Sequence, residues 1–263
     1  MTNPEVLFEA KGYIATITLN RPDRMNTISR TMLDELVQHL LSADRDPNVR
    51  VVILTGTGRA FCAGLDLTEV TQPTKGGITA GASNANNLDL RATPPTILFG
   101  MEKPTICALN GSAAGYGFDT ALGCDIRIAG RNAKLAAAFT KRGVVPESGG
   151  TWFLPRLLGW SKAAELIFTG RTLSADESLA MGLVSEVVDD PLKRANEIAA
   201  EIAANAPLAV QASKRMMRMG LTETFNDHVH HVFLQLLPLF RSEDAAEGMR
   251  AFLEKRTPEF RGR

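Results

Sequence analysis

The sequence lacks the features that mark several large classes of protein. It has no excess of one charge, because 29 lysine and arginine residues balance 29 aspartate and glutamate residues among 263. Without a basic field we expect no nucleic-acid partner. No apolar run reaches the roughly 18 residues of a membrane span, so we also expect no membrane partner. Residues 1–12 lack the basic start and apolar run of a signal peptide, which predicts a cytoplasmic location.

Residues that commonly bind metals are few and scattered. The spacing of the three cysteines matches no metal motif, and we interpret them as small buried residues in a reducing compartment: Cys62, Cys107 and Cys124. His228 and His231 could share one face of a helix, but no H-E-x-x-H pattern surrounds them. The sequence therefore predicts no metal site.

The early part of the chain alternates between strand and helix patterns. The segments predicted as strands are residues 13–19, 49–54, 105–109 and 124–129. Residues 32–41 place apolar side chains on one helical stripe, and we expect Thr31 and Asp34 to cap that helix. Residues 71–87 are rich in glycine, threonine and asparagine, which predicts a mobile surface loop.

Helical patterns dominate the second half of the chain. Ser174 and Glu177 form the pattern of a capping box, and Gly182 is a suitable stop for that helix. A last strand is predicted over residues 183–188. After Pro191 the pattern is helical almost to the end. Alternation followed by helices favours a protein of the α/β class.

Two segments share one design, in which a buried strand leads into a turn of small residues and then into a helix start. The first segment is VRVVILTG followed by TGRAFCAGLDL, and the second is TICALNG followed by SAAGYGFD. Helix N-termini carry unpaired N–H groups, and glycine lets a ligand approach the backbone. Two such turns aimed at one place would form an anion site with two donors. These glycines could instead serve only tight turns and close packing.

Two better-known motifs fail on this sequence. The third glycine of the dinucleotide pattern G-x-G-x-x-G falls on Phe61. Ser112 lies in GSAAG, which is not the G-x-S-x-G elbow of a serine hydrolase. Neither a dinucleotide cofactor nor a serine nucleophile is therefore expected.

Several segments together resemble the enoyl-CoA hydratase/isomerase (crotonase) family. They are NRPDRMNTIS, RAFCAGLDL, NGSAAGYGFD, GVVPESGGTWFLPRLLG, IFTGRTLSADESLAMGLVSEVV and FLEKRTPEF, in family order from about residue 13 to residue 260. The resemblance implies an α/β fold, a crotonase-like spiral of ββα units over residues 1–190. It further implies a helical C-terminal segment over residues 191–263, used for trimerisation and to cover the active site. A homotrimer or homohexamer acting on an acyl-CoA substrate is then expected, with no cofactor beyond the coenzyme A of the substrate.

The resemblance also assigns the two backbone donors. They are the amides of Leu65, which follows the glycine of AGLD, and of Tyr116, which lies between two glycines. Together they would hold the thioester oxygen as it gains negative charge. Gly64 and Gly115, which precede them, are expected to lie against the substrate.

Two acids occupy positions that carry catalytic acids in the family. Asp119 matches the first catalytic glutamate of the hydratases, and Glu147 matches the acid of some isomerases and dehalogenases. The second hydratase glutamate falls on Phe139, which cannot move a proton and is expected only to contact the substrate. We therefore expect Glu147 to be the main base, with Asp119 assisting, and slightly favour double-bond isomerisation over hydration. A solvated turn for Glu147 and a first-turn helix position for Asp119 are the structural alternatives.

Two cations and a few backbone groups are the candidates for binding the coenzyme. Arg24 and Lys255 are the cations expected to meet phosphate, with Lys255 reaching from a neighbouring subunit. Backbone groups around Ala63 and Asp66 are expected to meet the adenine by resemblance alone. The Asp66 side chain itself is expected to cap the helix after Leu65.

Three other functions stay open at this point. Asp119 and Glu147 could together form a hydratase. The chain could bind acyl-CoA or a protein partner without turnover, since Phe139 has replaced a catalytic acid. Glu147 could also act as a nucleophile in hydrolysis or dehalogenation.

Overall fold

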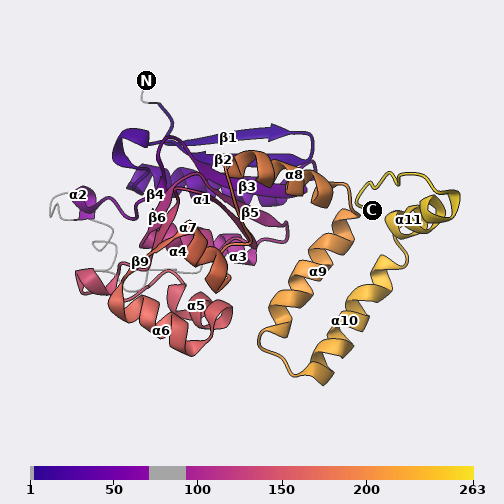
Figure 1. The fold of residues 1–263 in the computed structure, drawn as a ribbon. Coiled ribbons are helices and arrows are strands. Elements are labelled where there is room, and N and C mark those ends of the chain that lie inside the picture. Colours follow the sequence, from indigo (N-terminus) through magenta and orange to yellow (C-terminus); the bar gives the residue numbers. More distant parts are fainter. Residues whose placement is uncertain (1–2, 71–92) are drawn as a thin grey trace.

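The computed structural model describes residues 3–70 and 93–263, and the predicted loop over residues 71–87 lies outside them. The larger sheet has six strands in the order β1-β2-β3-β5-β7-β10 (Figure 1). Their bounds are Val6–Lys11, Ile14–Leu19, Val51–Gly56, Thr105–Leu109, Ile126–Gly130 and Glu186–Val188. β1 pairs with β2 in the antiparallel sense, and the other neighbours are parallel. The α/β class expected from the sequence is confirmed.

A second sheet of four short strands lies beside the first, in the order β4-β6-β8-β9. The bounds are Ala60–Cys62, Ser112–Ala114, Lys134–Ala136 and Thr172–Ser174. β4, β6 and β8 are parallel, and β8 pairs with β9 in the antiparallel sense. β3 leads into β4 and β5 into β6, with a helix after each pair: α2 (Leu67–Val70) and α4 (Tyr116–Leu122). This repeat is the expected spiral of ββα units.

Helices cover the larger sheet on both faces. α1 (Arg30–Arg45) buries Leu36 and Leu40 in the main core, together with Phe61 and Phe118 from the region of the second sheet. On the other face α8 (Pro191–Ala203) packs three alanines against Val51, Ile53 and Ile106: Ala195, Ala199 and Ala203. The segment predicted from residue 191 thus begins with a helix that belongs to the core. The role of residues 191–263 in trimerisation and in covering the active site stays a prediction.

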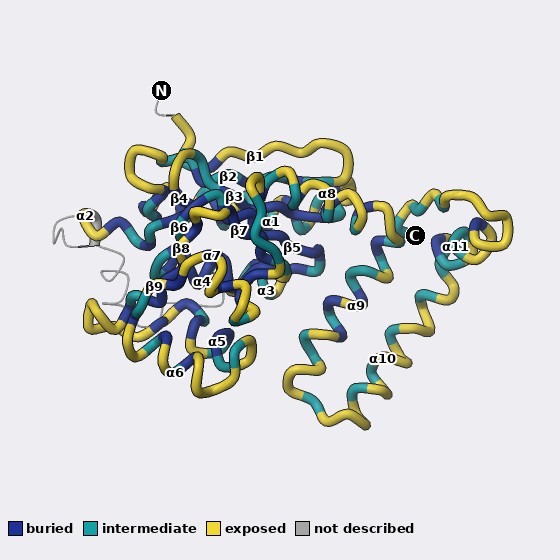
Figure 2. The backbone as a smooth tube through the Cα atoms, in the orientation of Figure 1, coloured by how far each residue is buried: buried dark blue, intermediate teal, exposed yellow. Residues whose placement is uncertain are grey.

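The remaining helices lie outside the sheets. They are α3 (Pro94–Gly100), α5 (Gly150–Leu158), α6 (Trp160–Thr169), α7 (Ala175–Met181), α9 (Pro207–Gly220), α10 (Phe225–Leu239) and α11 (Glu243–Glu254), with short 3-10 turns η1 (Pro22–Arg24) and η6 (Thr140–Arg142). α9 and α10 form a hairpin that extends away from the core, and Figure 2 shows that its outer helix is teal and yellow along its length. No helix among residues 3–70 and 93–263 combines the length and the apolar character needed to span a bilayer.

Several local predictions are confirmed, and one is wrong. The capping box of Ser174 with Glu177 is present, and α7 stops at Gly182 in the left-handed conformation. The expected capping pair of Thr31 and Asp34 is not the cap of α1. Instead Ser29 has an extended backbone, and its hydroxyl accepts a hydrogen bond from the Met32 amide at 3.0 Å. An N-cap precedes the first helical residue, and α1 begins before Thr31.

Candidate active site

The two small-residue turns lie side by side because the strands before them are paired. β4 and β6 are neighbouring parallel strands, with Ala60 opposite Ser112 and Cys62 opposite Ala113. Parallel strands end at the same edge of a sheet, so the turns that follow them meet there. Gly117 packs tightly across this junction, since a β-carbon there would lie 2.4 Å from the Cys62 carbonyl oxygen.

Gly64 and Gly115 shape the two turns. Both have a positive φ, 104° for Gly64 and 53° for Gly115, which glycine adopts without steric cost. A β-carbon on Gly64 would lie 3.0 Å from the Ala114 carbonyl oxygen and 3.8 Å from the Tyr116 amide nitrogen. The first turn is therefore in direct contact with the backbone of the second.

The amides of Leu65 and Tyr116 are left out of the backbone ladders. Ile28 bonds on either side of Leu65, donating to the Gly64 carbonyl at 2.8 Å and accepting from the Asp66 amide at 2.9 Å. Tyr116 is the first residue of α4, where an N–H has no acceptor within the helix. Within residues 3–70 and 93–263 neither amide donates a hydrogen bond to protein, so both remain available to a ligand.

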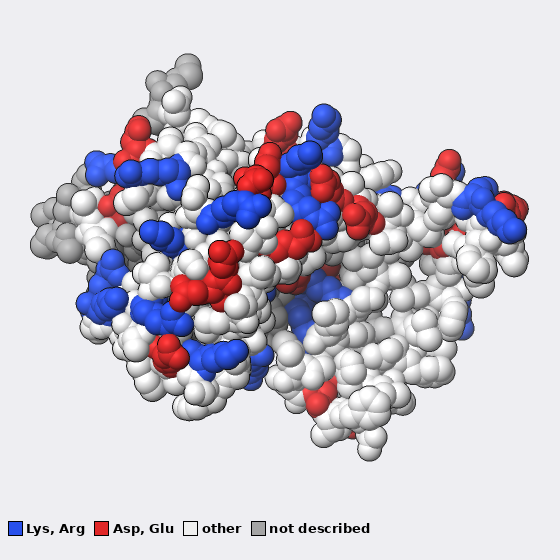
Figure 3. Space-filling view, in the orientation of Figure 1, with Lys and Arg blue, Asp and Glu red and all other residues white. Residues whose placement is uncertain are grey.

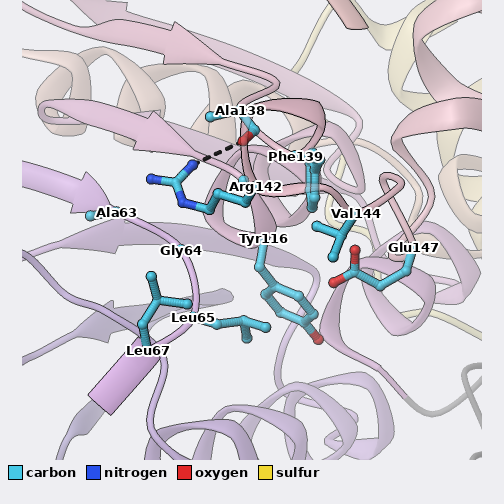
Figure 4. Close-up of a pocket in the computed structure, with 11 residues that line it drawn as sticks. Ala63, Gly64, Leu65, Leu67, Tyr116, Ala138, Phe139, Arg142, Val144 and Glu147 are labelled. Atoms are coloured by element: carbon cyan, nitrogen blue, oxygen red, sulfur yellow. Dashed lines mark hydrogen bonds between the residues drawn. The ribbon is translucent and has the colours of Figure 1, made fainter. Parts of the chain in front are cut away.

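Leu65 and Tyr116 line the same pocket, whose volume is about 100 Å³ (Figure 4). The described lining residues are Ala63, Gly64, Leu65, Leu67, Gly115, Tyr116, Ala138, Phe139, Arg142, Val144 and Glu147. Seven of these were expected from the sequence. The wall is mostly apolar, and an apolar wall strengthens any electrostatic interaction made inside it.

Glu147 is the only acidic residue in the described lining of the pocket. It lies between η6 and α5 and is an exposed residue. Figure 4 shows its carboxylate pointing toward Val144 and the ring of Tyr116. A carboxylate at this wall can accept a proton from a substrate held by the two amides.

Asp119 lies behind the pocket rather than in its wall. Its side chain is fully buried, and it is absent from the described lining. Oδ2 accepts hydrogen bonds from the Ser148 hydroxyl at 2.8 Å and the Gly150 amide at 3.2 Å, whereas Oδ1 has no partner. Burial raises the pKa of the Asp119 carboxyl to about 7, against the opposing effect of the two hydrogen bonds.

Tyr116 and Phe139 supply aromatic walls. The Tyr116 ring crosses the pocket in Figure 4 and is only 7% exposed, and Phe139 is 5% exposed. Burial raises the pKa of the Tyr116 hydroxyl, which therefore stays protonated at neutral pH. Both residues are hydrophobic surfaces against which an acyl chain can pack.

Sequence reasoning missed one charged residue of the pocket. Arg142 donates one hydrogen bond to the Ala138 carbonyl at 2.9 Å, and its guanidinium points toward Ala63 in Figure 4. It is the only cation among the described lining residues. The only signal in the sequence was its place just before VVPESGG.

The expected coenzyme contacts are only partly assembled within one chain. Asp66 caps α2 as predicted, with Oδ1 accepting from the Thr68 amide at 3.1 Å, and it also pairs with Arg21 at 3.1 Å. Arg24 lies in η1 and Lys255 at the end of α11, and neither lines the described pocket. α11 and α2 lie at opposite ends of the ribbon in Figure 1. A role for Lys255 at this pocket would need the Lys255 of a second chain.

The cysteines and the two helical histidines lie within the described part of the chain. All three cysteines are free and buried, as predicted. Among the described residues no group of three histidine, cysteine or acidic side chains could hold a metal ion. His228 and His231 instead both direct Nδ1 at the carboxylate of Glu223, at 3.3 and 2.9 Å.

These observations define a class of α/β proteins: a spiral of ββα units in which two glycine turns offer free amides beside an acid. Comparison with known proteins specifies the class. The family model described as enoyl-CoA hydratase/isomerase matches residues 9–263, and the chain belongs to this family.

Individual relatives agree with the family assignment over nearly their full length. The chain is 37% identical to the 1,2-epoxyphenylacetyl-CoA isomerase of Escherichia coli (strain K12), over 98% of each chain. It is 38% identical to enoyl-CoA hydratase EchA19 of Mycobacterium tuberculosis, covering 100% of this chain and 98% of the relative. The crystal structure of an enoyl-CoA hydratase from Bacillus anthracis superimposes with a TM-score of 0.91 at 36% identity, covering 98% of this chain and 100% of the other. The crotonase-like fold expected from the sequence is thereby confirmed.

Proposed function

We propose that this protein is an enoyl-CoA isomerase, which moves a double bond within an acyl-CoA by proton transfer. The amides of Leu65 and Tyr116 hold the thioester oxygen, and Glu147 carries the proton. The observation that supports this most directly is that these three residues line one pocket, with both amides free of protein acceptors in the described part of the chain.

The chemistry follows from the thioester. Removing a proton next to the thioester carbonyl creates an enolate, whose negative charge develops on the oxygen. Two fixed N–H donors stabilise that charge, and losing one such donor typically costs about 10²–10³ in rate. Glu147 takes the proton from one carbon and returns it to another, so the substrate and product have the same composition. No metal or redox cofactor enters this scheme, and the coenzyme A is part of the substrate.

Residues 139 and 119, where the hydratases of the family carry or could carry an acid, favour isomerisation over hydration. Adding water requires a second polar group to hold the water. Phe139 occupies the position where the resemblance puts the second hydratase glutamate, and Asp119 is fully buried behind the wall. Relatives of this chain are named both as an isomerase and as hydratases, so a hydratase using Asp119 with Glu147 is the alternative. Binding of acyl-CoA without turnover is the second alternative.

A panel of enoyl-CoA substrates of different chain length and double-bond position separates these functions. We expect a change in absorbance of the conjugated thioester at constant product mass. A mass gain of one water would instead show a hydratase. Tight binding without either change, and without exchange of the α-proton in D₂O, would show a binding protein and contradict the proposal.

We further propose that the chain assembles as a homotrimer or homohexamer in the cytoplasm through residues 191–263. α10 has no buried residue, and most of its exposed apolar side chains, continued by Phe240 just past its end, recur at helical spacing: Phe225, Val229, Val232, Phe233, Leu236, Leu237 and Phe240. Figure 3 shows the hairpin of α9 and α10 as mostly white, with few charged side chains on the face in view. An exposed apolar surface of this extent is typical of a subunit contact. In such an assembly Lys255 of one chain, and Arg24, are the proposed phosphate contacts.

A further inference from the structure

We propose that Asp119 is a positioning residue, which fixes the turn carrying Glu147 relative to the amide of Tyr116 and does not itself exchange protons with the substrate. The inference rests on the proposed function, because it assigns a role within the same site. It differs from the role that the resemblance gives to this position, where the hydratases use an acid that acts on the substrate.

Asp119 is enclosed by protein on all sides. Asp119 has no exposed surface, and it is not among the residues that line the pocket. Gly150 presses on the carboxyl so closely that a β-carbon at Gly150 would lie 2.5 Å from Oδ1. A substrate in the pocket therefore has no direct path to either oxygen of Asp119 unless the turn around Gly150 opens.

Asp119 is connected to Glu147 through the turn over residues 147–150. Oδ2 holds both the hydroxyl of Ser148 and the amide of Gly150, and Ser148 directly follows Glu147 in the chain. Gly149, between the two bonded residues, has a φ of 114°. The turn that presents Glu147 is thus fastened at two points to a single carboxyl oxygen.

α4 carries Asp119 together with one of the two proposed donors. Tyr116 and Asp119 are both on α4, one helical turn apart, and the Asp119 amide donates to the Gly115 carbonyl at 3.0 Å. α4 therefore carries one proposed donor to the thioester oxygen and, through Asp119, the anchor of the proposed base. A short rigid helix then sets the distance between the two groups that must act on the same enolate. Catalysis is sensitive to such distances, since a 1 Å displacement can cost about 10² in rate.

The protonation state of Asp119 matters little in this role. Oδ2 accepts the same two hydrogen bonds whether or not the carboxyl is ionised, and an asparagine amide oxygen can accept them as well. A group that transferred protons to the substrate could not be replaced by an amide. This difference makes Asp119→Asn the decisive variant.

The test measures exchange of the α-proton of an acyl-CoA in D₂O, with kcat and KM, for the wild type and five variants. We expect Glu147→Gln to lower exchange by about 10²–10⁴. We expect Asp119→Asn to stay within about tenfold of the wild type, with an unchanged pH profile. We expect Ser148→Ala to lose about 10- to 100-fold in kcat with little change in KM, because it removes one of the two hydrogen bonds that hold the turn and leaves Asp119 in place. Ser178→Ala is the matched control, since Ser178 is also buried and its hydroxyl makes one bond, to the Ser174 carbonyl at 2.7 Å.

A double-mutant comparison separates positioning from direct catalysis. If Asp119 acts through Glu147, then Asp119→Ala added to Glu147→Gln lowers the residual exchange no further. A further fall, or a loss in Asp119→Asn as large as that in Glu147→Gln with circular dichroism unchanged, would overturn the inference. Activity losses in Ser148→Ala and Ser178→Ala of equal size would overturn it as well. Absence of exchange in the wild type on every acyl-CoA would instead contradict the proposed function, so the two failures are distinguishable.

Discussion

Gly117 touches Cys62 so closely that the distance from a β-carbon at Gly117 to the Cys62 carbonyl oxygen would be only 2.4 Å. The contact joins α4 to β4, and thus the turn of Tyr116 to the turn of Leu65. The proposed convergence of the two amides on one oxygen therefore depends on the absence of a side chain at residue 117.

The first prediction concerns this contact. Gly117→Ala should push α4 and β4 apart, lowering the free energy of unfolding by about 1–3 kcal/mol. Activity should fall further than stability, by about 10² in kcat, because the two amides would no longer meet one atom. Steady-state kinetics and urea unfolding measure both effects. Gly100→Ala is the control, since a β-carbon there meets nothing within 4 Å, and it should change neither quantity appreciably.

The second prediction concerns Glu147. Glu147→Gln keeps the size of the side chain but removes its capacity to accept a proton, so kcat for isomerisation should fall by about 10²–10⁴. The dissociation constant of a saturated acyl-CoA should change little, which isothermal calorimetry can measure. Glu9→Gln, an exposed site on β1, should leave both values unchanged. Normal turnover by Glu147→Gln would show that another group is the base.

The third prediction follows from the pKa of Asp119, which burial raises from its ordinary value of 3.8 to about 7. The folded state binds the proton more tightly than the unfolded chain, so the stabilisation is complete below pH 3.8 and is lost as the pH rises through 7. At about 1.4 kcal/mol per pKa unit, the loss is on the order of 4 kcal/mol. The unfolding free energy of the wild type, relative to that of Asp119→Asn, should therefore decrease from pH 4.5 to pH 8. A difference that is constant over this range would contradict a raised pKa at Asp119.

The fourth prediction concerns Arg142, the cation of the described lining. We infer that this cation also contacts a phosphate of the coenzyme, in addition to Arg24 and Lys255. Arg142→Ala should then raise KM for acyl-CoA several-fold with little change in kcat, because a contact outside the reacting atoms contributes equally to ground and transition states. A truncated thioester without phosphates should show no such effect. Lys141→Ala is the neighbouring control, since Lys141 packs near Gly170 and is not in the described lining. An equal rise in KM for the truncated thioester would show that Arg142 contacts the acyl chain or thioester rather than a phosphate.

Much of the fold, including the two small-residue turns, could be predicted because the signals are local. A few neighbouring residues suffice to predict the strand Thr105–Leu109, from its apolar run, and the start of α7, from the capping box at Ser174. The strands of the second sheet could not be predicted in this way. Each has three residues, too few for alternation to show, and pairing across the chain defines them.

In the candidate site, too, contacts between residues far apart in the sequence could not be predicted. Spacing alone places Asp119 one turn after Tyr116, near the proposed donors, which is correct. It cannot show that Ser148 and Gly150, some 30 residues later, close over the carboxyl and separate it from the pocket. Burial and the pKa of a side chain depend on such distant contacts, so a residue's position could be predicted while its role could not.

The last prediction tests the apolar stripe of α10. Phe233 is 54% exposed at the middle of that helix. In the proposed trimer or hexamer it would be covered, and Phe233→Asp would bury an unpaired charge, which costs several kcal/mol per subunit contact. Light scattering should therefore give the mass of three or six chains for the wild type and a smaller mass for the variant. Leu7→Asp is the control, because Leu7 is also exposed but lies on β1, away from the hairpin, and it should keep the wild-type mass. A wild type that is monomeric at micromolar concentration would show that the stripe serves some other contact.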